Sequence, residues 1–590
     1  MPAINLFIKR ACFVLAAGII IVSSYLAFRN AVRQPFHLDE AEEATMGLKF
    51  SRIGPKTFLP VAEGNMPVTH PLLYTFTHAL VQKVFGPAEL PLRLYGVFHF
   101  LLSLFLSALI LFKLLSDKKK YLQRTGLAIL TGLYLVNPLL VQHSVVINAD
   151  NNILASTILL FLYFFIDFEM KGDLDKKSGI KSRLKLAVLF SLCLWSKELA
   201  PSFLLCGIIV YRILSCEFKK MLLDLLLVGI TGFIIFWLGW WLYCFFTGTD
   251  VLGFIKFTLI NKSKQAFTPN YFSQLWERFF YGLRWHIYWV SAAFFTAGAI
   301  FVYTRVKNFF LTRKAETVDF IFVCALSMWV PFQLFRPTID MLKYHYPAYN
   351  LLLILVAWTA IWAIEKKEEA TGKAFTVSAL QACVLSLVLI IFTAHYYTLG
   401  DYLLGLWGPL YKYLNGHFLW YYYLPLGFAF ILISLFLKIK DWMPGFALTS
   451  VLLIFPINIA LSLNQAKADY LTFEIWLNYG EKGLGKTVEY LSSRIQDGSV
   501  TVLRQDIEYY LVYRKGIKIA QNIPPEKIFQ ASDRMLLLVF LSQSPVEYFV
   551  ADKISSKIIA DEEIFNLIGK YFILEKNFGD FYIFRRITRG

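Results

Sequence analysis

The stretch LYGVFHFLLSLFLSALILFKLL (94–115) is apolar almost throughout and carries one charged residue, Lys113, near its end. A helix needs about 20 such residues to cross the hydrocarbon core of a bilayer. Inside the bilayer every backbone N–H and C=O group needs a partner within the protein, and an α-helix supplies those partners within one segment. The stretch therefore predicts a transmembrane helix.

Runs of the same kind recur along the chain and predict a polytopic α-helical membrane protein with about 13 transmembrane helices. They lie near 11–28, 94–115, 125–142, 151–168, 184–196, 199–214, 221–246, 281–304, 318–335, 346–364, 374–398, 418–438 and 443–463. The composition agrees, because 57% of the residues are hydrophobic and only 17% are charged, which is too apolar for a water-soluble protein. The first run lacks a small-x-small cleavage site, so we expect it to be retained as a helix.

The formal net charge of +17 comes largely from short connections that are rich in Lys and Arg. These connections are 116–124, 169–183, 215–220, 305–317 and 365–373. An excess of Lys and Arg marks cytoplasmic loops, so the long segments 29–93, 247–280 and 399–417 are predicted to face the opposite side. We therefore expect a multi-pass protein of the plasma (inner) membrane, with the lipid bilayer and not nucleic acid as its partner.

The chain from 464 onward has the periods of a water-soluble α/β domain. GLGKTVEYLSSRI (483–495) predicts an amphipathic helix, and buried strands are predicted at 499–503, 534–541 and 546–551. Residues 571–586 predict a strand, a turn and a second strand. We thus predict a membrane domain at 1–463 and a tail domain at 464–590. Because the N-terminus is predicted to be cytoplasmic and the number of spans is odd, the tail domain is predicted to lie outside the cytoplasm. The seven cysteines are scattered and indicate no disulfide framework.

The first outer loop, 29–93, begins with the acidic stretch HLDEAEEATMGLKFSRIG (37–54). Asp39 can cap a helix along the membrane surface, with a weakly apolar face formed by Ala41, Ala44, Thr45 and Leu48. One interpretation is a capped, solvated surface helix, since acids near a helix start are also favoured by the helix dipole. The other is that Asp39 or Glu40 points into a cavity as a general base.

Further along the loop comes THPLLYTFTHALVQKVFGPAELPLRL (69–94). Together with Asp39-Glu40 it resembles the GT-C glycosyltransferases of the protein O-mannosyltransferase and aminoarabinose-transferase type. In that family an Asp-Glu pair is followed by a His-Pro-Pro-Leu-Tyr-like stretch, here His70-Pro71-Leu72-Leu73-Tyr74, and by Phe-Gly and Arg-Leu, here Phe85-Gly86 and Arg93-Leu94. Leu72 replaces the second proline of the stretch.

Three further matches lie at predicted outer ends of spans. Asp150 in VINADNN (146–152) resembles the second-loop acid of the family, and Lys197 in WSKELAP (195–201) resembles its Ser/Thr-Lys pair. KYHYPAYN (343–350) resembles its Arg/Lys-Tyr-x-x-Pro-x-x-Pro stretch, with Asn350 in place of the last proline. A lysine at a helix end can also simply extend to the membrane surface, so Lys197 and Lys343 have that second interpretation.

The resemblance implies a glycosyltransferase that takes a sugar from a polyprenyl-phosphate donor, transfers it to an extracytoplasmic lipid, glycan or protein, and inverts the anomeric centre. Asp39 is the expected base, with Glu40 and Asp150 as alternates or orienting groups. Lys197, Lys343 and Arg336 are expected to bind the donor phosphate, and His70 and Tyr344 to position substrate. Such a donor is already activated and needs no nucleotide site, and none of the nucleotide-binding motifs is present.

No cofactor is expected, and the scattered histidines and cysteines predict no metal site. A carboxylate cluster beside a phosphate can hold a divalent cation without a recognisable motif, so metal dependence stays open. A polytopic transporter or a flippase for lipid-linked sugars is the alternative function. Inverted repeats and charges in the middle of spans would favour it, and the sequence has neither.

Overall fold

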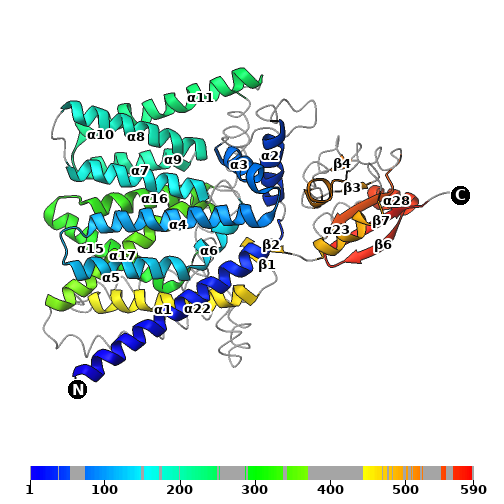
Figure 1. The fold of residues 1–590 in the computed structure, drawn as a ribbon. Coiled ribbons are helices and arrows are strands. Elements are labelled where there is room, and N and C mark those ends of the chain that lie inside the picture. The colour runs from blue at the N-terminus through cyan, green and yellow to red at the C-terminus, as the bar shows by residue number, and fades with distance from the viewer. Residues whose placement is uncertain are drawn as a thin grey trace.

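The computed structural model shows a bundle of long helices followed by a small sheet domain, which lies beyond one end of the bundle (Figure 1). The structure describes residues 2–36, 39–53, 73–147, 152–171, 176–197, 200–248, 251–252, 286, 290–335, 342–369, 443–467, 470–474, 477–480, 483–495, 500–502, 507, 509–517, 521–522, 542, 546–552 and 562–587. The polytopic helical fold with a C-terminal α/β domain is therefore confirmed.

The bundle helices overlap the predicted spans wherever those spans are described, except that two short helices replace the span predicted at 125–142. They are α1 (Pro2–Arg33), α4 (Glu89–Leu114), α5 (Lys120–Val136), α6 (Pro138–Val145), α7 (Asn152–Lys171), α8 (Lys176–Ser196), α9 (Ala200–Leu214), α10 (Phe218–Asp224), the π-helix η3 (Leu225–Ile230), α11 (Thr231–Thr247), α15 (Ala292–Thr312), α16 (Thr317–Phe335), α17 (Tyr346–Glu369) and α22 (Met443–Lys467). Within the described part of the chain, 6 helices are long and apolar enough to cross a membrane, or up to 7 if a bent pair is one span. The predicted spans 374–398 and 418–438 lie outside the described residues, so the total stays a prediction.

The bent pair replaces the straight span predicted at 125–142. Helices α5 and α6 meet at an angle of 61° on either side of Asn137. Pro138 has no N–H to donate to the preceding turn, which ends α5. The Asn137 side chain then accepts a hydrogen bond from the Leu140 amide at 3.1 Å and caps α6. The bend turns α6 toward α4, where it contributes to the site described below.

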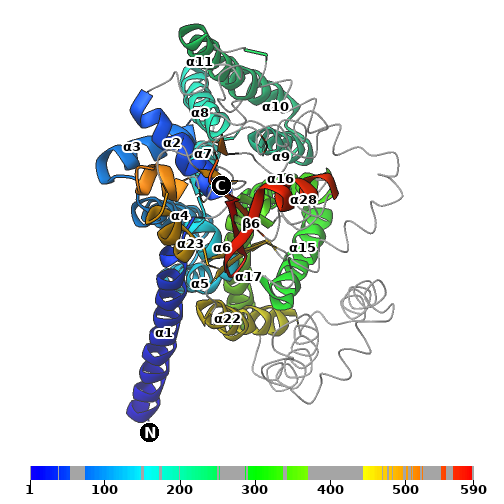
Figure 2. The same ribbon diagram turned by 90° about the vertical axis from the view of Figure 1, so that its right-hand side faces the viewer.

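The two ends of the bundle differ in character. The described parts of the predicted cytoplasmic connections lie at one end, here called the basic-loop end, together with the start of α1 (Figure 1). The short helices α2 (Asp39–Ile53) and α3 (Leu73–Phe85) and the sheet domain lie at the other, here called the tail-domain end. Seen from that end, the sheet stands in front of the helix ends while α1 extends away from the bundle (Figure 2).

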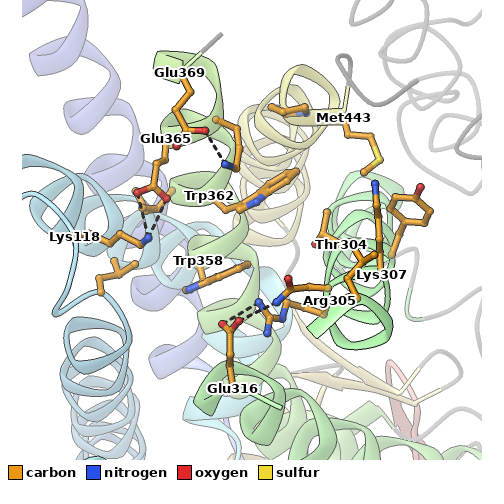
Figure 3. A pocket seen from close by; sticks show the side chains of 17 residues that line it. Lys118, Thr304, Arg305, Lys307, Glu316, Trp358, Trp362, Glu365, Glu369 and Met443 are labelled. Atoms are coloured by element: carbon orange, nitrogen blue, oxygen red, sulfur yellow. Dashed lines mark hydrogen bonds and ion pairs between the residues drawn. The ribbon is translucent and has the colours of Figure 1, made fainter. Parts of the chain in front are cut away.

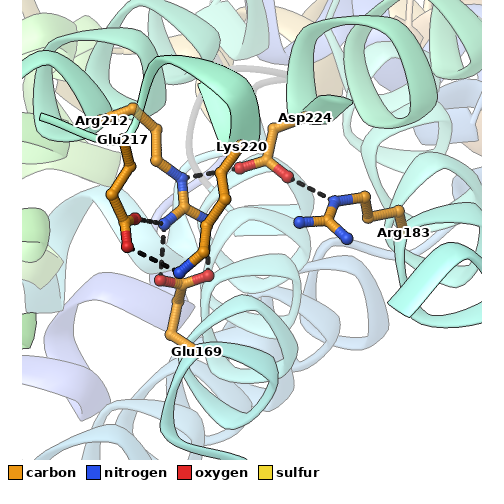
Figure 4. A network of polar contacts seen from close by, with 6 residues as sticks. All are labelled: Glu169, Arg183, Arg212, Glu217, Lys220 and Asp224. Carbon is orange, nitrogen blue, oxygen red and sulfur yellow. Dashed lines mark hydrogen bonds and ion pairs between the residues drawn. The ribbon is translucent and has the colours of Figure 1, made fainter. Parts of the chain in front are cut away.

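A network of buried and half-buried charges joins four helices at the basic-loop end (Figure 4). Its members are Glu169, Arg183, Arg212, Glu217, Lys220 and Asp224. Arg212 donates to Glu169 at 2.7 Å and to Asp224 at 2.8 Å, and Arg183 also donates to Asp224 at 2.8 Å. Because three carboxylates balance three cations, no net charge is buried here, which is the condition under which such groups are tolerated in an interior.

The tail domain contains a sheet with the strand order β4-β3-β5-β7-β6. Its elements are α23 (Leu484–Ser492), β3 (Val500–Val502), the π-helix η6 (Tyr509–Arg514), β4 (Gln521–Asn522), β5 (Tyr548–Asp552), α28 (Glu562–Tyr571), β6 (Phe572–Phe578) and β7 (Phe581–Arg586), preceded by the hairpin β1 (Tyr470–Glu474) and β2 (Leu477–Gly480). β3 is parallel to β4 and β5, whereas β7 is antiparallel to β5 and β6. The strands predicted at 499–503, 546–551 and 571–586 are present, and the strand predicted at 534–541 lies outside the described residues.

Gly96 lets α4 approach α6 very closely. A Cβ atom at this position would lie 2.0 Å from the backbone oxygen of Ser144 and 3.0 Å from Nδ2 of Asn152. The first of these neighbours is backbone, which cannot rotate away. The contact between α4 and α6 therefore requires a residue without a side chain at position 96.

We expect Gly96→Ala to lower the free energy of unfolding by about 1–3 kcal/mol, because the added methyl group must separate two packed helices. Gly298→Ala in α15 is the matched control, since a Cβ atom there meets nothing within 4 Å and alanine favours a helix by up to about 1 kcal/mol. Thermal unfolding of the purified variants in detergent measures both. Equal midpoints for the two variants would contradict the packing argument.

Candidate active site

Helix α2 forms a layer across the tail-domain end of the bundle (Figure 1). Its apolar face is the predicted one, and Ala41, Ala44 and Leu48 are buried. The partner of that face is α3, which packs so closely that a Cβ atom at Gly47 would lie 3.1 Å from Cβ of His78. The acidic helix is therefore a packed element of the protein, and its first residue is Asp39.

Glu40, the second residue of α2, is fully buried and bound to Arg93 of α4. Nη1 of Arg93 donates to Oε1 of Glu40 at 2.9 Å, and Nη2 donates to Oε2 at 3.0 Å. The backbone amide of Ile147 donates to the same carboxylate at 3.0 Å. Two parallel bonds between a guanidinium and a carboxylate fix the relative orientation of both groups. Glu40 is thus held in place by the fold, which favours the orienting role that the sequence left open.

Arg93 uses its remaining donors on the backbone of two other segments. Nε donates to the carbonyl of Gln34 at 2.9 Å, Nη2 to that of Pro35 at 3.0 Å, and Nη1 to that of Val145 at 2.8 Å. With the two bonds to Glu40, all five guanidinium donors have acceptors. We call this group the Arg93 cluster. It joins α4 to the segment before α2 and to the end of α6.

A stripe of neutral polar side chains lies on the face of α3 that packs against α2 and α4. Tyr74, His78 and Gln82 follow one another at helical spacing, and all three are buried. Gln82 donates to the Ala44 carbonyl at 2.9 Å, and the rings of Tyr74 and His78 lie 4.0 Å apart. Burial, and secondarily His99, lowers the pKa of His78 to about 3, so its imidazole is neutral. The sequence did not point to His78 or Gln82.

Lys197 follows the last residue of α8 at the same end of the bundle. Its ammonium lies 5.0 Å from the centre of the Tyr344 ring, and Tyr344 stacks on Phe332 with ring centres 5.7 Å apart. Trp195, two residues earlier, packs in a cluster with Met46 of α2. Lys197 is itself buried, with 6% of its surface exposed, unlike a lysine that extends to the membrane surface. The structure therefore brings the predicted Lys197 and Tyr344 together, close to α2.

Asn350, which stands where the family motif has a proline, joins three helices. Oη of Tyr134 in α5 donates to Oδ1 of Asn350 at 2.8 Å, and the Ser107 hydroxyl of α4 lies 2.6 Å from Tyr134 Oη. Nδ2 of Asn350 donates to the Tyr346 carbonyl one turn earlier. A proline could not make these bonds. Asn350, in place of the proline of the motif, therefore connects the start of α17 to α5 and α4.

Several predicted residues cannot be placed. His70, Asp150 and Arg336 lie outside the described residues. Asp39 begins α2 and Lys343 lies in the short helix η5 (Leu342–His345), but their side chains are outside the described set. Their roles stay predictions. Among the described residues, no group of three His, Cys, Asp or Glu side chains could hold a metal ion.

Two cavities of about 490 Å³ each lie at opposite ends of the bundle. The one at the basic-loop end is lined by Trp358 and Trp362, and two of its cations, Lys118 and Arg305, pair with the carboxylates of Glu365 and Glu316 (Figure 3). Lys118 lies 3.1 Å from Glu365 there, so its charge is already compensated. The other cavity lies between the first outer loop and the tail domain. Its lining includes Arg33, Pro35, Glu89, Tyr510 and Lys515.

We predict that Arg93→Ala lowers the free energy of unfolding by about 3–5 kcal/mol, because it leaves the Glu40 carboxylate buried without its cation. Lys171→Ala is the control, since Lys171 is exposed and its pair with Asp167 within one helix is worth about 0.2–0.5 kcal/mol. Unfolding midpoints in detergent compare them. If Arg93→Ala were as stable as Lys171→Ala, the Arg93 cluster would not stabilise the fold.

Comparison with known proteins identifies the fold. No protein-family model matches the chain, and no curated protein matches its sequence. ArnT from Cupriavidus metallidurans bound to undecaprenyl phosphate is similar in structure, with a TM-score of 0.59 and 14% identity over 98% of both chains. The apo form of an oligosaccharyltransferase from Archaeoglobus fulgidus has a TM-score of 0.52 and 10% identity, covering 97% of this chain and 74% of that one. Both are GT-C glycosyltransferases, and this chain has the GT-C fold.

Proposed function

We propose that this protein is a glycosyltransferase that moves a sugar from a polyprenyl-phosphate donor to an acceptor outside the cytoplasm. The observation that carries the proposal is the Arg93 cluster, which fixes the acidic start of α2 at the end of the bundle where the buried Lys197 also lies. An enzyme of this kind needs a fixed base and cations for the leaving phosphate. The structure solved for ArnT with undecaprenyl phosphate supports the class of donor.

Asp39 is the proposed general base, and the fixed position of its neighbour Glu40 supports that assignment. The base removes the proton from the acceptor hydroxyl as the oxygen forms a bond to the anomeric carbon. The bond between that carbon and the phosphate oxygen breaks, and polyprenyl phosphate leaves with the electron pair. A single displacement of this kind inverts the anomeric centre. Glu40 orients the start of α2, and Asp150 is the alternate base.

The leaving phosphate is proposed to bind Lys197, with Lys343 and Arg336 as further cations. Lys197 is buried against Tyr344, and a cation in a low-dielectric site interacts more strongly with a phosphate than one in water. The proposal also keeps Tyr344 and His70 as residues that position substrate. A divalent cation beside the carboxylates is compatible with this arrangement and is not required by it.

The proposed domain arrangement follows from charge. The Lys/Arg-rich connections of the 1–463 membrane domain face the cytoplasm, and the 464–590 tail domain faces the other side. The end of the bundle that contains Glu40, Arg93 and Lys197 then faces away from the cytoplasm. Activated sugar nucleotides are not needed there, because the polyprenyl phosphate carries the sugar to the site.

We expect Asp39→Asn to lower kcat by about 10²–10⁴-fold while the protein remains folded and binds its donor, because an amide of the same shape cannot accept the hydroxyl proton. Asparagine caps a helix as well as aspartate does, so a capping residue would tolerate the change. Turnover of a radiolabelled polyprenyl-phosphate sugar measures kcat. Full activity of Asp39→Asn would remove Asp39 as the base and leave Asp150.

Lys197→Ala is the matched comparison, because this variant should change donor binding whereas Asp39→Asn should change turnover. It should weaken donor binding, because it removes a buried cation from the phosphate, while Asp39→Asn should leave donor binding unchanged. Donor titrations on both variants separate the two roles. Unaltered donor affinity in Lys197→Ala would contradict the assignment of Lys197 to the phosphate.

A further inference from the structure

The tail domain touches the first outer loop through two adjacent tyrosines of the π-helix η6. Oη of Tyr510 accepts a hydrogen bond from the backbone amide of Phe36 at 2.7 Å. Tyr509 donates to the carbonyl of Pro87 at 3.0 Å, and its ring meets the Phe36 ring edge-on with centres 5.3 Å apart. Phe36 and Tyr509 are fully buried. The contact is therefore specific, and it joins residues separated by more than 470 positions in the chain.

Phe36 also belongs to the surroundings of Arg93. The guanidinium lies 5.3 Å from the centre of the Phe36 ring, and it donates to the carbonyls of Gln34 and Pro35. Residues 34–36 are thus held by Arg93 on one side and by the tyrosines of the tail domain on the other. The two tyrosines fix both the backbone amide and the ring of Phe36, and Arg93 fixes the two carbonyls that precede it.

The position of Phe36 bears directly on the start of α2. Only two residues lie between Phe36 and Asp39, and a chain extends by at most about 3.3–3.6 Å per residue. A shift of Phe36 is therefore passed on to the first turn of α2, where Asp39 and Glu40 lie. General-base catalysis depends on a base placed within hydrogen-bond distance of the proton it removes.

The Tyr510 hydroxyl is well suited to this contact. Burial, and then the nearby Glu89 carboxylate, raises the pKa of Tyr510 well above its usual value, so the hydroxyl keeps its proton. A hydroxyl both accepts and donates, and Tyr510 accepts from Phe36 with the Glu89 carboxylate at the start of α4 close enough to raise its pKa. One side chain of the tail domain thereby joins the segment before α2 to the helix that carries Arg93.

We propose that Tyr510 is a positioning residue of the active site, so that the tail domain completes a catalytic unit whose reacting groups lie in the membrane domain. The inference rests on the proposed function, because it assigns Asp39 the chemistry that Tyr510 supports. The tail domain acts through Phe36 and need not touch substrate.

Tyr510→Phe tests the inference, because it removes the hydroxyl and keeps the ring. In the full-length protein, kcat should fall by between about 10- and 100-fold, the effect of a small misplacement of a reacting group, while KM for the donor stays unchanged. Tyr509→Phe is the matched control. It removes the bond to Pro87 and leaves the Phe36 amide bonded, so its kcat should be close to that of the wild type.

Amide hydrogen exchange provides a readout that does not depend on activity. The Phe36 amide should exchange faster in Tyr510→Phe than in Tyr509→Phe or the wild type. Wild-type kcat in Tyr510→Phe, or an equal loss in both variants, would overturn the positioning role, and unchanged exchange at Phe36 would overturn the contact itself. A wild-type protein that transfers no sugar would instead refute the proposed function, and the exchange data would still decide the contact.

Discussion

A single buried guanidinium organises the tail-domain end of this protein. Arg93 stands near the start of a membrane helix, where an unpaired charge would cost several kcal/mol. The cost is offset because Glu40 supplies the opposite charge and three backbone carbonyls take the remaining donors. These acceptors come from three parts of the chain. The first loop, α2 and the end of α6 must therefore be in place together.

The rest of the bundle supports this arrangement. The bend at Asn137 brings α6 to α4, and Gly96 allows the two helices to come close enough for Arg93 to reach Val145. At the basic-loop end the neutral network around Arg212 joins the ends of other helices without leaving a net buried charge. Charged groups thus stabilise both ends. At the tail-domain end they lie beside the acidic helix α2 and the buried Lys197.

Much of the fold could be predicted from the sequence because its physical cause is local. A long apolar run can cross a bilayer as an α-helix without help from other segments, so each span can be recognised from its own sequence. The hairpin of β6 and β7 was predicted at 571–586 as a strand, a turn and a second strand, because a turn between two strand-forming runs is also a local signal. The break at Pro138 interrupts a run that otherwise satisfies the length of a span, and hydropathy alone does not show it.

The site could be predicted only in part. Asp39, Glu40 and Lys197 were chosen as candidates because their motifs resemble those of a family, but the pairing of Glu40 with Arg93 depends on helix packing between positions 53 apart. An arginine close to an apolar run is a sign of such a pair, since a buried charge requires one. Nothing in the sequence pointed to Tyr510, because its contact with Phe36 exists only once the tail domain has docked.

In the proposed function, this protein cleaves the bond between a sugar and a polyprenyl phosphate on the side of the membrane away from the cytoplasm. The most direct measurement places the purified protein in vesicles with a polyprenyl-phosphate sugar labelled on both parts and with an extract of candidate lipid, glycan and protein acceptors. A glycosyltransferase of the proposed kind releases sugar-free polyprenyl phosphate and forms a product of inverted configuration. Movement of the intact lipid-linked sugar across the bilayer, with no cleavage, would contradict it and indicate a flippase.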